Sequence, residues 1–292
     1  MLTIARILCP VDFSEFSDKA CDYAHSFARH FGAKLFVLHV AEPFVPVDPS
    51  SISPSLIEQV YAQNIADAEE KVRELSERQN WNDVEHEVVL ERGPVADAIL
   101  HFVEDKNIDL IAMGTHGRRG LDRLVLGSVT ERILRTVRAP VLAVHTLPRG
   151  SAAAREKPVQ FRKILFCTDF SDNSPRALEY AFLLACKCKA AISLLHVIER
   201  PGGGKDLEAE KQQVLQKLEA VVPQSVQNCA TVELGVRAGQ AYQVILEHAA
   251  EMEADLIVMG VRGRNALDVA LFGSTTYRVI QLGKCPVLAV RN

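Results

Sequence analysis

The stretch Asp109-Leu110-Ile111-Ala112-Met113-Gly114-Thr115-His116-Gly117, followed after nine intervening residues by Gly127-Ser128, decides the fold. A short apolar run that ends at a glycine predicts a buried strand opening into a loop. The second glycine, with its serine, predicts the start of a helix. Glycines let backbone N–H groups approach an anion, and the free amides of a helix N-terminus complete the cradle. The stretch therefore predicts a phosphate site at the end of a strand.

The same pattern returns in the second half, from Asp255 to Met259 and on through Gly260, Gly263 and Gly273-Ser274. The offset between the halves is 157 residues early (Ile7 to Ile164) and 146 residues late (Ala139 to Cys285). The second copy has therefore lost residues between its second and third strands. A repeat of this length indicates a duplicated domain rather than a solenoid unit. Other matching segments are 7–14 with 164–171, 38–40 with 195–197, and 139–144 with 285–290.

Strands alternate with helical patterns in both halves, which predicts right-handed crossovers and a parallel sheet covered on both faces. We expect one domain over residues 1–146, a linker over 147–160 and a second domain over 161–292. Strands are expected near 4–9, 34–41, 84–91, 108–113, 141–145, 162–167, 190–198, 229–236, 255–259 and 286–290. Helices are expected near 15–31, 55–79, 93–106, 127–137, 173–188, 204–221, 239–251 and 273–282.

Composition narrows the class of protein. The 292 residues are 48% hydrophobic and 24% charged, which is typical of a soluble globular chain. A net charge of −4 lacks the basic footprint of a nucleic-acid binder. No apolar run approaches the roughly 20 residues that span a membrane, and the start lacks a signal-peptide pattern. Seven scattered cysteines without a CxxC pair are typical of reduced thiols, so we expect a cytoplasmic protein.

In such sheets, ligands bind beyond the carboxyl ends of the strands. Asp12 and Asp169 each follow the first strand of a half, where a carboxylate can accept hydrogen bonds from ribose hydroxyls. The alternative is that each aspartate is the N-cap of the following helix, and the two roles can coexist through the neighbouring Ser14 and Ser171. His39 and His196 end the second strands, and for them we expect packed, hydrogen-bonded rings rather than ligands or catalysts.

These motifs resemble the universal stress proteins, in the tandem form with two such domains per chain. The resemblance covers nearly all of the chain outside the linker. It rests on Gly-x2-Gly-x9-Gly-Ser, the signature of the ATP-binding branch, which is complete in both halves. It implies a Rossmann-like α/β fold with strand order 3-2-1-4-5 in each half. It also implies that the edge strands Val141–Val144 and Val287–Val290 meet, making the halves an intramolecular pseudo-dimer.

The resemblance further implies an adenine nucleotide (ATP, ADP or AMP) in each half, with Mg²⁺ held through the phosphates rather than by protein ligands. Cys167-Thr168 replaces Pro10-Val11 at the second adenine slot and departs there from the family pattern. In the first half, the implied adenosine contacts are Pro10, Val11, Asp12 and Val40, and the implied ribose and phosphate contacts are Met113, Gly114, Gly117, Gly127, Ser128, Val129 and Thr130. The second half supplies Cys167, Thr168, Asp169, Val197, Met259, Gly260, Gly263, Gly273, Ser274, Thr275 and Thr276.

Missing motifs exclude other nucleotide classes. No Gly-x-Gly-x-x-Gly follows the first strand, and no Gly-x4-Gly-Lys-Ser/Thr occurs, which argues against dinucleotide Rossmann enzymes and P-loop NTPases. The motifs hold no carboxylate or lysine on the phosphate side, so we expect slow or absent turnover. We expect a nucleotide-binding stress-response or signalling protein, a homodimer of tandem chains, in which nucleotide biases conformation or the binding of unidentified protein partners. The alternative is a slow ATPase or another adenylate-handling enzyme of the same broad fold.

Overall fold

The computed structural model describes residues 2–43, 53–78, 81–116, 126–145, 159–199, 207–261 and 273–291. Gly117, Gly263 and linker residues 147–158 lie outside these ranges. The strands of the first half are β1 (Arg6–Val11), β2 (Lys34–Ala41), β3 (His86–Arg92), β4 (Leu110–Gly114) and β5 (Val141–Val144). Those of the second half are β6 (Lys163–Thr168), β7 (Ala191–Ile198), β8 (Val232–Ala238), β9 (Leu256–Val261) and β10 (Val287–Arg291).

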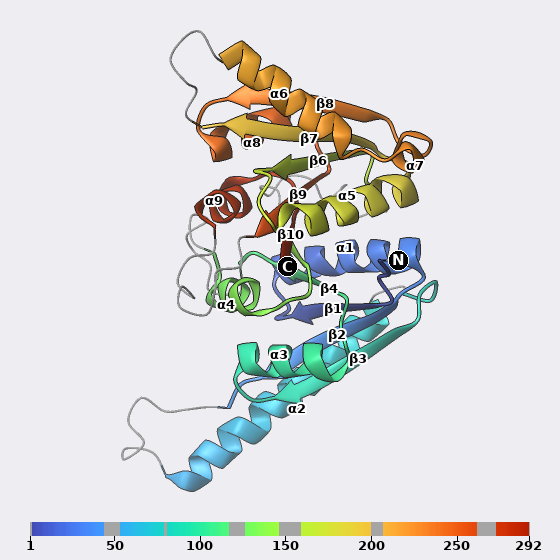
Figure 1. Cartoon of the computed structure of the whole chain (residues 1–292). Coiled ribbons are helices and arrows are strands. Elements are labelled where there is room, and N and C mark those ends of the chain that lie inside the picture. Colours follow the sequence, from blue (N-terminus) through green and yellow to red (C-terminus); the bar gives the residue numbers. More distant parts are fainter. Residues whose placement is uncertain are drawn as a thin grey trace.

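The ten strands form one mixed sheet that runs through both halves (Figure 1). The strand order is β3-β2-β1-β4-β5-β10-β9-β6-β7-β8, so each half has the predicted order 3-2-1-4-5. Pairing is parallel inside each half, and β5 is antiparallel to β10 where the halves meet. The predicted α/β fold of two tandem parallel sheets is therefore confirmed.

Helices cover both faces of the sheet, because the strands bury alternate side chains in two separate hydrophobic clusters. Among the described residues, no helix has the length and apolar character needed to cross a bilayer. One face carries α1 (Glu15–Phe31), α2 (Pro54–Arg78), α5 (Ser174–Cys188), α6 (Leu207–Ala220) and α7 (Gln224–Gln227). The other face carries α3 (Val95–Asp105), α4 (Ser128–Thr136), α8 (Ala241–Glu251) and α9 (Ser274–Leu282).

Two repeated aspartates hold the amino ends of neighbouring strands together. Oδ2 of Asp109 accepts the backbone N–H groups of Ala5 and Arg6, at 2.8 and 2.9 Å. Oδ2 of Asp255 accepts the equivalent N–H groups at the start of β6, also at 2.8 and 2.9 Å. The aspartate that opens the repeated Asp-Leu-Ile motif therefore joins the first strand of each half to the fourth.

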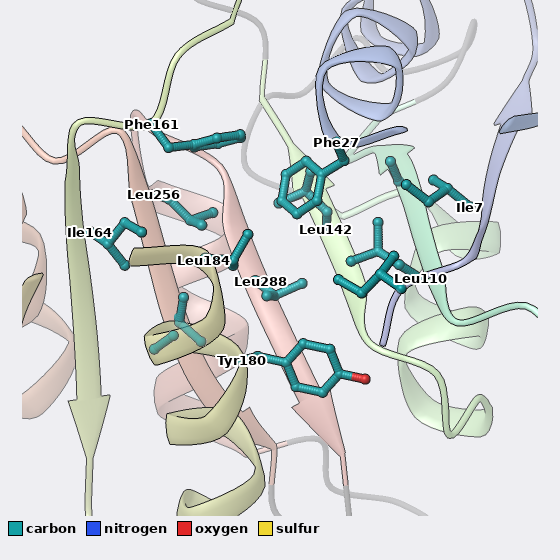
Figure 2. Packing of buried hydrophobic residues seen from close by; sticks show 14 of the residues in the cluster. Ile7, Phe27, Leu110, Leu142, Phe161, Ile164, Tyr180, Leu184, Leu256 and Leu288 are labelled. Carbon is teal, nitrogen blue, oxygen red and sulfur yellow. The ribbon is translucent and has the colours of Figure 1, made fainter. Parts of the chain in front are cut away.

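The two halves are joined through equivalent residues of their last strands. Leu142 of β5 pairs with Leu288 of β10, and both side chains are fully buried. Because the two leucines occupy the same position in the two repeats, the pairing has the self-complementary character of a two-fold interface. Figure 2 shows both leucines inside a cluster that continues from Phe27 of α1 to Tyr180 and Leu184 of α5. The predicted pairing of the edge strands is confirmed.

The length difference between the halves lies in the connection from second to third strand. Residues 42–85 join β2 to β3, whereas residues 199–231 join β7 to β8. Helix α2 has 25 residues and its counterpart α6 has 14, followed by the short α7. At 1.5 Å per residue, α2 is about 37 Å long and α6 about 21 Å. Figure 1 shows α2 projecting well beyond the sheet. The residues that the second half lacks between its second and third strands therefore correspond to a shorter helix.

The expectation that all thiols are reduced is wrong at one pair. Cys186 near the end of α5 forms a disulfide with Cys229, which follows α7, and their Cα atoms are 5.1 Å apart. The two cysteines are separated by 43 residues, so their pairing depends on the packing of α5 and α7 and leaves no local sequence signal.

We expect the strand junction to limit the stability of the whole chain. Leu288→Ala leaves a cavity in the core shared by the halves and should lower the free energy of unfolding by about 2–5 kcal/mol. Leu282→Ala is the matched control, because Leu282 of α9 is 42% exposed and its replacement should change stability by less than about 0.5 kcal/mol. Urea denaturation of both variants measures the difference, and equal effects would contradict a shared core at the junction.

Candidate functional site

A cavity of about 860 Å³ opens at the carboxyl ends of β1, β2 and β4 in the first half. Its volume lies in the range usual for small-molecule sites. It gathers every first-half residue singled out from the sequence except Gly117, which lies outside the described residues. Their contact with a ligand stays a prediction. The gathered residues are Pro10, Val11, Asp12, Val40, Met113, Gly114, Gly127, Ser128, Val129 and Thr130.

Asp12 serves the start of α1 and lines the cavity as well. Its Oδ1 accepts hydrogen bonds from the backbone N–H of Ser14 at 3.1 Å and from the Ser14 hydroxyl at 2.6 Å. Ser14 Oγ in turn caps α1 by accepting the N–H of Ser17 at 3.3 Å. The N-cap of α1 is therefore Ser14 and not Asp12, and Asp12 supports the cap through Ser14. A carboxylate accepts up to about four hydrogen bonds, so capping is compatible with ribose binding.

The residue after each aspartate has an unusual backbone conformation. Phe13 has φ 62° and Phe170 has φ 56°, in the left-handed region that bulky residues rarely adopt. Such a conformation costs on the order of 1–3 kcal/mol and clusters at ligand sites. The same backbone conformation in both halves turns the chain away from the strand direction just after Asp12 and Asp169.

Histidines of the second strands hold these strained turns. His39 Nδ1 donates to the carbonyl oxygen of Val11 at 2.7 Å, and its ring centroid lies 4.5 Å from that of Phe13. His196 repeats the arrangement in the second half, with Nδ1 2.8 Å from the Thr168 carbonyl oxygen. Both histidines are thus packed and hydrogen-bonded, as expected, and they fix the carboxyl end of the first strand against the second.

The opposite side of the cavity is the N-terminus of α4. The N-cap residue, Gly127, offers no side chain to the first-turn amides, in contrast to Ser14 of α1. Ser128 and Val129 of this first turn line the cavity. The first amides of a helix lack partners within it and carry its positive dipole end, so this edge favours an anion. The Thr130 hydroxyl donates to the Gly114 carbonyl oxygen at 2.8 Å and holds α4 against β4.

The glycine at the end of β4 has a packing role. A Cβ at Gly114 would lie 2.8 Å from Phe16 Cβ and 2.9 Å from the Phe16 carbonyl carbon. Gly260 faces Asn173 in the same way, with a carbonyl oxygen 3.1 Å from the added atom. These two glycines admit the start of α1 or α5, whereas Gly273 has nothing nearer than Thr276 Oγ1 at 3.9 Å.

The second half repeats the framework. Asp169 Oδ1 accepts from the Ser171 N–H at 2.9 Å and the Ser174 hydroxyl at 3.1 Å. The Thr276 hydroxyl donates to the Gly260 carbonyl oxygen at 3.4 Å. Strand pairing sets Cys167 beside Met259, with Thr168 and Val197 at the same carboxyl edge and Gly273, Ser274 and Thr275 at the start of α9. Gly263 lies outside the described residues. A smaller cavity of about 370 Å³ between α6, α7 and β8 contains none of these residues.

Four residues of α2 also line the first-half cavity and were missed by the sequence reasoning. They are Asn64, Asp67, Ala68 and Lys71. Their spacing of three and four residues places them on one face of the helix. Polar residues at helical spacing normally indicate a solvated face, so this signal is not distinctive. In the described part of the chain, no three His, Cys, Asp or Glu side chains cluster as metal ligands would.

His145, just after β5, links the glycine region to the second half. Its Nδ1 lies 3.2 Å from the Thr115 hydroxyl, which also contacts His116 Nδ1 at 2.9 Å. Burial lowers the pKa of His145 to about 4, and the neighbouring His116 lowers it too, while the backbone of Ile280 in α9 acts in the opposite direction. The imidazole of His145 is therefore neutral at pH 7.

Gly114 and Gly273 differ in the space available for a side chain, so the same substitution should affect stability differently at the two positions. Gly114→Ala should destabilise the chain by about 1–3 kcal/mol, because the new methyl group overlaps the backbone of α1. Gly273→Ala has open space and should shift stability by less than about 1 kcal/mol. Thermal unfolding of the two variants compares them directly. A Gly114→Ala protein as stable as wild type would contradict the packing role.

The lowered pKa of His145 should make the stability of the folded chain sensitive to acid. Below pH 6.5 the unfolded chain protonates His145 while the folded chain does not, so stability present above that pH is lost as pH falls towards 4. The loss is on the order of 3 kcal/mol for a shift of this size. His145→Asn should flatten the pH profile of the unfolding free energy in this window. An unchanged slope would show that His145 does not titrate as inferred, whatever constant offset the substitution causes.

Both halves of the chain match a known protein family. The model of the universal stress protein family matches residues 3–145 and again residues 160–291. A universal stress protein of Mycolicibacterium smegmatis is 26% identical over 98% of this chain and 96% of its own length. One from Methanocaldococcus jannaschii is 37% identical, over 48% of this chain and 81% of its own. The crystal structure of a universal stress protein from Archaeoglobus fulgidus superposes with a TM-score of 0.73, at 25% identity and 98% coverage of both chains. The chain belongs to the universal stress protein family, in its tandem two-domain form.

Proposed function

We propose that the first half binds an adenine nucleotide, and that its occupancy biases the conformation or partner binding of a stress-response or signalling protein. The cavity is the observation that carries the proposal, because its two sides differ in character. The uncapped first turn of α4 favours anionic phosphates, and Asp12 suits the hydroxyls of a ribose. Val11, Val40 and Met113 supply the apolar lining that a flat base needs.

In each half, residues of the repeated motif have the chemistry that this ligand needs. Ser128 and the first amides of α4 would hold phosphate in the first half, and Ser274 with α9 would do so in the second. Mg²⁺ would then be held through the phosphates. We therefore propose up to two nucleotides per chain, with the tighter site in the first half. The association of two tandem chains also remains a proposal, which light scattering of the purified protein tests.

Hydrolysis is the competing activity. Among the described cavity residues from β4 and α4, none is a carboxylate or a lysine, so neither element supplies a carboxylate base or a lysine that clamps the phosphates. We expect turnover to be slow or absent. A phosphate-release assay with ATP and Mg²⁺, repeated with Ser128→Ala, distinguishes a nucleotide-binding protein from an ATPase. Turnover that the substitution abolishes would identify an ATPase.

Calorimetric titration of the full chain with ATP tests binding. Ser128→Ala removes a hydroxyl from the anion-binding edge and should weaken the first-half site by about 10- to 150-fold, the equivalent of a hydrogen bond to a charged group. Ser76→Ala, on an exposed part of α2, is the matched control and should bind as wild type does.

Mass spectrometry of ligand extracted from the purified protein identifies the natural nucleotide. Absence of heat on titration with ATP, ADP and AMP, together with no co-purified nucleotide, would refute the proposed function.

A further inference from the structure

The helix α2 contributes a wall to the first-half cavity that the repeated motifs do not encode. Asn64, Asp67 and Lys71 follow one another at helical spacing, with Ala68 between them at 5% exposure. We call these four residues the α2 stripe. Three of them carry exposed polar side chains, and the small Ala68 leaves space at the centre of the stripe.

The stripe lies in the longer of the two counterpart helices. α2 runs for 25 residues and α6, its counterpart, for 14, and Figure 1 shows α2 reaching far past the strand ends. The duplicated motifs therefore provide the same framework in both halves, while the stripe residues lie outside those motifs. Residues outside the shared motifs can differ between the two copies and are suited to setting what one site recognises.

The charged residues that line the first-half cavity indicate the chemistry of its ligand. Asp12, Glu42 and Asp67 line the cavity and make one part of it acidic, whereas the start of α4 favours an anion. An elongated ligand with phosphates at one end and hydrogen-bond donors at the other matches this pattern. A second phosphate on the ribose would meet the acidic part and be repelled.

We propose that the α2 stripe reads the base of the bound nucleotide and selects an amino-bearing purine, a role that rests on the proposed function. The carboxamide of Asn64 can match the amino donor and ring-nitrogen acceptor of adenine with two hydrogen bonds. Asp67, whose carboxylate already accepts from Gln63 Nε2 at 2.7 Å, is held in place as a further acceptor. The keto oxygen of guanine at the same point would face the carboxylate of Asp67, which cannot donate a hydrogen bond to it.

Lys71 completes the stripe one turn further along the helix. Its position four residues after Asp67 places an ammonium beside the acidic part of the cavity. This cation limits the repulsion that the carboxylates exert on a polyphosphate, so selection by Asp67 does not abolish binding.

Titration of the full chain with ATP and with GTP tests the stripe. The binding component that Ser128→Ala weakens identifies the first-half site. Asn64→Ala and Asp67→Ala should each weaken ATP at that site by about tenfold and reduce the preference for ATP over GTP. Glu69→Ala, an exposed acidic residue of the same helix outside the cavity, should leave both affinities unchanged.

Photolabelling with 8-azido-ATP gives an independent readout. The tryptic peptide covering residues 35–71 contains both the end of β2 and the stripe, and sequencing the labelled peptide separates them. Attachment within 64–71 that unlabelled ATP suppresses is expected, and attachment at Val40 alone would overturn the inference. Wild-type ATP affinity in the stripe variants would also overturn it while the proposed function stands. A wild-type chain that binds no nucleotide would refute both.

Discussion

The antiparallel pairing of β5 with β10 is the constraint on which the rest of the structure depends. A parallel five-stranded sheet that ends in a buried Val-Leu-Ala-Val strand exposes an edge that must be covered. The chain covers two such edges at once, because the equivalent residues Leu142 and Leu288 pair with each other. The same pairing merges the cores below α1 and α5, so one hydrophobic cluster runs through both halves (Figure 2).

This pairing also brings α4 and α9 into contact with the end of the last strand of the opposite half. Arg291 at the end of β10 donates from Nη1 to the carbonyl oxygen of Arg135 in α4. His145, the equivalent residue after β5, lies close to the backbone of Ile280 in α9. Each helix therefore has its first turn at the site of its own half and its last turns against the strand end of the other. A cation near a helix C-terminus also stabilises its dipole, as Arg291 does for α4.

Sequence reasoning predicted most of the fold because the strongest local signals agree with one another. The helix expected at 15–31 has those bounds in the structure, since Ser14 caps its start and Gly32, at φ 64°, ends it. The four-residue α7 was missed because it is too short to show a helical period. The Cys186–Cys229 disulfide was missed because it joins segments distant in the sequence. For the site, the glycine and aspartate motifs predicted the residues that gather around the cavity, and the strand-end histidines were expected to be packed and hydrogen-bonded, but the partners in these contacts were not predicted. The packing of Gly114 on Phe16 and the hydrogen bond of His39 to Val11 depend on tertiary contacts.

The role of the α2 stripe as a cavity wall could not be predicted from the sequence pattern. Its polar residues have the spacing of an ordinary solvated face, and only the position of α2 over the strand ends turns that face into a cavity wall. Both halves share the strained phenylalanine, the strand-end histidine and the threonine that holds α4 or α9 against the fourth strand of its half. The two halves nevertheless differ at one strand end, where Cys167-Thr168 stands in place of Pro10-Val11. They differ further in the connection between second and third strands, which can lengthen or shorten without disturbing the sheet, because connections on the surface tolerate insertion better than buried strands do. If the stripe selects the base as proposed, this connection sets the selectivity of the first-half site.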